Sequence, residues 1–129
     1  MQLPTPGTSA LYLEVPARPT SLQVVRIAAT ASAAEILPDV NALDDLRLSV
    51  DELSILLVEV AGPDDSLTMR VWHAPPSVLI EGRVLAGDGS ALREPSEVAT
   101  MLLSTVADEH ELIRDGNDLV FRLCISRRD

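Results

Sequence analysis

The stretch NALDDLRLSVDELSILLVEV, residues 41–60, decides the fold of this chain. Its apolar residues recur at steps of three and four, which places them on one face of a helix of about five turns: Leu43, Leu46, Val50, Leu53, Leu57 and Val60. Asn41 is a candidate cap for the start of this helix, and Gly62 followed by Pro63 ends it. The sequence therefore predicts a long central helix whose apolar face is buried.

The segments on either side of the central helix predict strands and two further helices. Alternating or apolar runs indicate strands over residues 10–15, 66–73, 77–85, 109–114 and 118–125. Helical spacing predicts one helix from residue 20 or 21 to residue 36 and another over residues 97–108. The expected buried face of the second of these comprises Val98, Met101, Leu102, Thr105 and Val106.

Two glycines carry specific expectations. Gly82 lies inside a predicted strand, which indicates a bulge or a close approach to the backbone. Gly116, between Asp115 and Asn117, is typical of a hairpin turn.

The order of these elements predicts the fold class. Helices that gather on one face of a largely antiparallel sheet form two layers. We therefore expect an α+β two-layer sandwich, with three helices on one face of a five-stranded mixed, mostly antiparallel sheet. At 129 residues the chain is expected to form a single domain over residues 10–126, preceded by a flexible N-terminal segment at residues 1–9.

The charge balance argues against some classes of partner. Twenty acidic residues face ten basic ones, all of them arginine, so the net charge is −10. Such a surface repels nucleic acid and favours a basic protein surface as partner. No apolar run approaches the roughly 18 residues that a membrane span requires. We expect no nucleic-acid or membrane partner and, by default, a cytoplasmic location.

The residue types that commonly bind metals show no pattern typical of a metal site. Cys124 is the only cysteine, which excludes an internal disulfide and a cysteine metal cluster. His73 and His110 are far apart and have no ligand spacing. We therefore expect no metal site.

Three segments carry a family resemblance through their order and spacing: LEVPARPTSLQVVR (residues 13–26), LDDLRLSVDE (residues 43–52) and STVADEHELIRDG (residues 104–116). They resemble a first strand and helix joined by a proline-marked turn, the start of an N-box helix, and a last helix running into a closing hairpin. This order is that of the histidine-kinase-like ATPase fold, called GHKL or Bergerat. Within that group the chain resembles the small bacterial anti-sigma factors of the serine-kinase type.

The resemblance implies a regulator that binds a sigma factor, is released by an anti-anti-sigma protein, and often forms a homodimer. It also implies that an arginine of the first helix lies on the surface that meets these partners. Arg26 occupies that place and is the expected partner-binding residue, although an arginine that simply reaches solvent is an equal interpretation. On the central helix, Asp51 is expected to pair with Arg47 one turn earlier.

The nucleotide site that the resemblance implies is altered in this chain. Active members carry a catalytic glutamate on the N-box helix and, four residues later, an asparagine that helps to hold Mg²⁺. Here Glu52 fits the glutamate but is followed by Leu56, and leucine cannot coordinate magnesium. Asp88 is the nearest candidate for the adenine-reading aspartate, with a different spacing, or it is a turn aspartate among glycines. Residues 92–100 lack the glycines of a phosphate-binding loop.

We therefore expect a degenerate site with no cofactor, in which Glu52 is vestigial or merely solvated. Three functions remain open. The first is an anti-sigma-like regulator that acts by protein binding, with ATP binding and kinase activity weakened or lost. The second is an ATP-dependent serine kinase of an anti-anti-sigma factor that uses Mg-ATP at a divergent site. The third is a homo-oligomeric structural module.

Overall fold

The structure is a computed structural model that describes residues 1–85 and 97–127. In chain order the described elements are η1 (Pro6–Thr8), β1 (Leu11–Pro16), η2 (Pro19–Ser21), α1 (Leu22–Ala33), α2 (Val40–Val60), β2 (Ser66–Ala74), β3 (Ser77–Val84), α3 (Glu97–Val106), β4 (Glu109–Asp115) and β5 (Asp118–Ser126). These bounds confirm the predicted elements to within a few residues. No helix of the described residues is both long and apolar enough to cross a membrane.

The five strands form one sheet in the order β1-β2-β3-β5-β4, and every neighbouring pair is antiparallel. The α+β class is confirmed, but the expectation of a mixed sheet is wrong. The two helices between β1 and β2 return the chain to the end of the sheet where β1 stops, so Pro16 pairs with Ser66. A parallel neighbour would need a connection that returns the chain to the opposite end of β1, where that strand begins.

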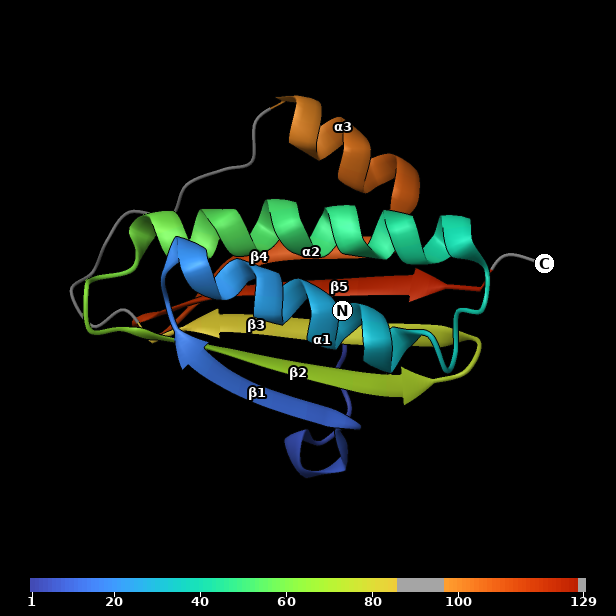
Figure 1. Ribbon diagram of the computed structural model, residues 1–129, viewed down its shortest axis with the longest axis horizontal. Helices are drawn as coiled ribbons and strands as arrows, with labels where there is room; N and C mark the ends of the chain where they lie inside the picture. The colour runs from blue at the N-terminus through green and yellow to red at the C-terminus, as the bar shows by residue number, and fades with distance from the viewer. Residues whose placement is uncertain (86–96, 128–129) are drawn as a thin grey trace.

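The helices cover one face of the sheet (Figure 1), where α1 and α2 lie side by side and α3 lies beside α2. The predicted stripe of α2 is confirmed, since Leu46, Val50, Leu53 and Leu57 are fully buried in the core. Asp39, and not Asn41, caps this helix: its Oδ1 accepts a hydrogen bond from the Asn41 amide at 3.1 Å. The helix begins at Val40, two residues earlier than a cap at Asn41 implies, and the cap moves with it.

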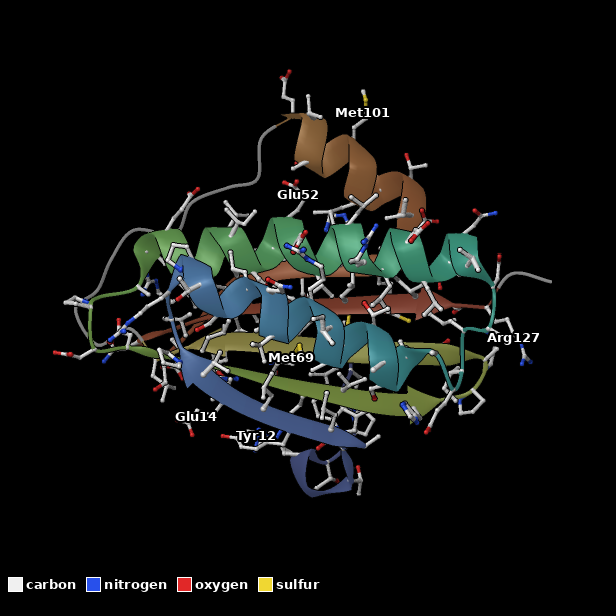
Figure 2. All side chains as sticks on the ribbon, in the orientation of Figure 1. Tyr12, Glu14, Glu52, Met69, Met101 and Arg127 are labelled. Carbon is white, nitrogen blue, oxygen red and sulfur yellow. The ribbon has the colours of Figure 1, made fainter. Side chains whose placement is uncertain are left out.

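The predicted buried face of α3 is wrong in part. Val98 and Met101 are 79% and 69% exposed, whereas Ala99, Leu103 and Val106 are buried. In Figure 2 Met101 points away from α2. Both sets of residues have helical spacing, because most of this helix is apolar, so periodicity alone cannot decide which set faces α2.

Gly82 is explained by a close approach and not by a bulge. It pairs with Phe121 across β3 and β5, and a Cβ atom at this position would overlap the ring of Phe121. At the β4–β5 turn, Gly116 has a φ of 63°, a conformation that glycine adopts without strain. The predicted turn is confirmed.

The outer face of the sheet, opposite the helices, carries a row of side chains that crosses all five strands. We call it the charged row; strand register aligns its members Tyr12, Arg70, Glu81, Arg122 and Glu111. The Arg70 guanidinium lies 4.3 Å from the centre of the Tyr12 ring. The Arg122 Nε donates to Glu81 at 3.2 Å, and its Nη1 donates to Glu111 at 3.3 Å.

The N-terminal segment also contacts this outer face. Trp72 points outward from β2, yet it is only 2% exposed. Its Nε1 donates to the carbonyl of Thr5 at 3.1 Å. Residues 1–9 thus contribute to the burial of an aromatic side chain on the face that lacks the helix layer. Their predicted flexibility, and the division into residues 1–9 and 10–126, stay predictions.

Candidate functional site on the two flanks of α2

Helix α2 carries candidate residues on two flanks, one facing α1 and one on the side of α3. On the first flank, the Arg26 Nε of α1 donates to Asp51 Oδ1 of α2 at 2.9 Å. The two side chains are 36% and 25% exposed, so this ion pair is partly shielded from solvent. Arg26 is therefore held against α2 and does not extend freely into water.

The predicted partner of Asp51 is wrong. Asp51 pairs with Arg26, while Arg47 lies 3.6 Å from Asp44 in an exposed pair three residues apart. The α1 helix packs against the flank of α2 that carries Asp51, which brings the Arg26 guanidinium within hydrogen-bond distance. A pairing across two helices has no signal in the sequence of either one.

Arg26 also borders a hollow of about 440 Å³ on the surface of α1 and α2. We call it the α1–α2 groove; its lining comprises Gln23, Arg26, Ile27, Thr30, Ala31 and Arg47. The lining contains two guanidinium groups and no carboxylate. The Thr30 hydroxyl donates a hydrogen bond to the backbone carbonyl of Arg26 at 2.8 Å, so this donor already has a partner within α1.

Ile27 and Arg47 were not identified as site residues from the sequence. A signal was present, since Arg26 is the only charged residue of the twelve in α1. A surface helix normally carries charged and polar residues on the side away from the core. Val24 and Ile27 are instead 50% and 58% exposed.

The other flank of α2 carries the candidate nucleotide residues. Glu52 is partly exposed and projects from α2 on the side of α3 in Figure 2. Leu56, one turn further along, is packed against the core. The place of the magnesium-binding amide therefore holds an apolar side chain that contributes to folding. Asp88 and residues 92–96 lie outside the described residues, so the site is described on its α2 side only.

Across residues 1–85 and 97–127, no group of three or more His, Cys, Asp and Glu side chains is arranged to hold a metal ion. Cys124 is half-buried, and burial raises the pKa of its thiol, an effect to which the nearby charges of Asp108 and Glu109 add. A raised thiol pKa disfavours the thiolate that metals and electrophiles require.

His73 has a structural environment that the sequence did not predict. Its Nε2 lies 3.0 Å from the hydroxyl of Ser32, and its Nδ1 lies 3.5 Å from a carboxylate oxygen of Glu35. Glu35 is 75% exposed, so its attraction to the imidazole is screened by water. These contacts attach the end of α1 to β2, and His73 is interpreted as a structural residue.

Known proteins resemble this chain over most of its length. No protein-family model matches the chain. Over 110 residues, which are 85% of this chain, it is 31% identical to two curated relatives from Mycobacterium tuberculosis, strains CDC 1551 / Oshkosh and ATCC 25618 / H37Rv. Both are described as "Anti-sigma-F factor RsbW", and the chain spans 65% of their length. The resemblance to anti-sigma factors inferred from the sequence is thus confirmed as a sequence similarity to these two proteins.

Proposed function

We propose that this chain is an anti-sigma regulator that acts by binding a sigma factor. Two observations support it: the 31% identity to anti-sigma-F factors, and the position of Arg26. The Arg26 pair with Asp51 is the structural observation that carries the proposal, because it fixes a guanidinium at the surface of α1. We also propose that the two-layer sandwich is a GHKL fold and that the protein acts in the cytoplasm.

The geometry of Arg26 suits recognition of a protein partner. Arginine has five N–H donors in a planar fork. Asp51 accepts a hydrogen bond from the Arg26 Nε at 2.9 Å, which fixes the position of the guanidinium relative to α2. A pre-oriented arginine loses less conformational entropy when a partner binds, and this favours affinity.

The proposal further holds that ATP binding and kinase activity are weakened or lost. Leu56 supplies no oxygen ligand one turn after Glu52, and it is packed against the core. Magnesium requires oxygen ligands in near-octahedral geometry. Under this proposal no cofactor is needed, and Glu52 has no catalytic role.

Co-purification tests the binding function directly. The chain is mixed with each purified sigma factor of its source bacterium, and complexes are separated by gel filtration. We expect one complex to form and to be weakened by Arg26→Glu but not by Arg114→Glu, an exposed arginine of β4. If no sigma factor binds the wild type, the proposed function is wrong.

Thermal unfolding tests the loss of nucleotide binding. A ligand that binds only the native state raises its stability by about 2.7 kcal/mol at a hundred times its Kd. We expect millimolar Mg-ATP to leave the melting temperature of the chain unchanged. A rise of several degrees would contradict this part of the proposal and leave the binding part intact.

One observation favours a second candidate, an ATP-dependent serine kinase of an anti-anti-sigma factor. Glu52 is partly exposed on α2, at the position where the resemblance implies a catalytic glutamate. This candidate requires Mg-ATP and transfer of radiolabelled phosphate to the anti-anti-sigma protein, with the transfer lost on Glu52→Ala. Under either candidate, an anti-anti-sigma protein would release the sigma factor, and the chain would be able to form a homodimer.

A further inference from the structure

The exposed side of α1 is unusually apolar for a helix at the surface of an acidic protein. Val24 and Ile27 are about half or more exposed, and Ala31 beside them is exposed as well. The core side of the same helix is formed by Val25, Ala29 and Ala33. A helix that is apolar on both sides normally has a second contact, either in the core or with a partner.

The charges around this surface define the chemistry of that partner. The chain carries a net charge of −10, yet the lining of the α1–α2 groove contains two arginines and no carboxylate. The pair of Arg47 with Asp44 is long, at 3.6 Å, and both side chains are about half exposed. Exposed pairs of this kind contribute little, so Arg47 is available to a new carboxylate.

We propose that the α1–α2 groove binds an acidic amphipathic helix of the protein partner, with Ile27 against its apolar side chains and Arg26 and Arg47 on its carboxylates. This inference rests on the proposed anti-sigma function and adds Ile27, Arg47 and the charge of the bound segment. A third helix fits between two helices by inserting its side chains into the groove that they form. Arg26 is fixed by Asp51 and Arg47 lies on α2, so the two cations border the groove from different helices.

The proposal separates the charge of the contact segment from that of the whole partner. At long range the net charge of −10 attracts a partner that is basic overall. At short range the two arginines select a segment that is locally acidic. A partner that is acidic throughout would be repelled before it reached the groove.

Binding to a sigma factor gives the first test. Arg47→Glu and Ile27→Asp are compared with Arg114→Glu, which places the same charge reversal on β4. We expect the first two to weaken the complex by at least about tenfold and the control to change it less than about twofold. Circular dichroism confirms folding, and both test positions are exposed. An intact complex with both variants would overturn the inference and leave the anti-sigma function standing.

A peptide experiment tests the groove independently of any sigma factor. Two synthetic amphipathic helical peptides are titrated by calorimetry; they share one leucine face and carry either glutamates or lysines beside it. We expect the glutamate peptide to bind the wild type and to bind Arg47→Glu at least about tenfold more weakly. Net charge alone would favour the lysine peptide, so tighter binding of that peptide would overturn the inference.

A second copy of this chain is the other possible occupant of the groove. Sedimentation of the wild type and of Ile27→Asp distinguishes it. A wild-type dimer that Ile27→Asp dissociates, together with no binding of the glutamate peptide, would overturn the inference. If no sigma factor binds but the glutamate peptide does, the proposed function fails while the chemistry of the groove is supported.

Discussion

The two faces of the sheet use the same five strands and are stabilised by different interactions. The inner face, under the helices, is apolar; Leu67, Met69 and Val71 of β2 are all buried there. The outer face carries the charged row, in which Glu81 is only 13% exposed between arginines. Apolar burial needs only the correct alternation along each strand, whereas the charged row also needs the correct register between strands. The inner face is therefore predictable from sequence, and the outer face is not.

The largest expected effect is on the inner face. Gly82→Ala would place a Cβ atom where it overlaps the edge of the Phe121 ring, which is buried among core neighbours. We expect a loss of about 3 kcal/mol in the free energy of unfolding, measured by urea denaturation. Gly7→Ala is the matched control, because a Cβ at Gly7 meets no atom within 4 Å. Equal stability of the two variants would show that the inner face is not closely packed.

The next largest effect is expected on the outer face. Glu81 accepts from the Arg122 Nε at 3.2 Å and lies 3.7 Å from the Arg83 Nε. Glu81→Gln removes the negative charge that both arginines contact. Because these arginines are mostly buried, we expect a loss of about 2 kcal/mol in the free energy of unfolding. Glu14→Gln, an exposed glutamate of β1, should change stability by less than about 0.5 kcal/mol. If both substitutions have the same small effect, the charged row does not stabilise the sheet.

A smaller effect is expected where the N-terminal segment covers the outer face. Trp72→Phe keeps an aromatic ring but removes the hydrogen bond from Nε1 to the Thr5 carbonyl. We expect a loss of about 1 kcal/mol in the free energy of unfolding. Proteolysis of residues 1–9 should also become faster, because this contact no longer holds them. An unchanged cleavage rate would mean that the hydrogen bond does not retain the segment.

The smallest effect is expected from Cys124 at high pH. Burial raises its thiol pKa above the ordinary value of 9.0, so the native state favours the neutral thiol. Its contribution to stability is complete below pH 9.0 and is lost as the pH rises through the raised pKa. The free energy of unfolding of the wild type relative to Cys124→Ala should therefore fall as the pH rises above 9.0. A constant difference between the two across this range would contradict the shift.

The long helix and the β4–β5 turn were predictable because each rests on a local pattern. The stripe from Leu46 to Leu57 has helical spacing. The turn at Gly116 needs a positive φ, which glycine adopts readily. The face of α3 was predicted wrongly because its sequence is apolar on more than one side. The parallel component of the sheet was wrong because strand neighbours follow from how helices return the chain, which no strand sequence records.

The candidate site was predictable only as single residues. Arg26 and Glu52 were identified by resemblance, and the structure assigns them to elements α1 and α2. The pairing of Arg26 with Asp51 joins residues 25 positions apart, so it depends on how two helices cross. Ile27 and Arg47 belong to the groove for the same reason. Contacts between helices are set by tertiary structure, and neither charge nor periodicity within one helix specifies them.

The burial of Trp72 has a practical consequence for experiments on this chain. It is the only tryptophan, and it lies on the sheet face opposite the helix layer that carries the α1–α2 groove. Its fluorescence emission should therefore stay constant when a ligand occupies the groove and shift to longer wavelength when residues 1–9 detach. This single tryptophan thus reports on the N-terminal segment from the face opposite the groove.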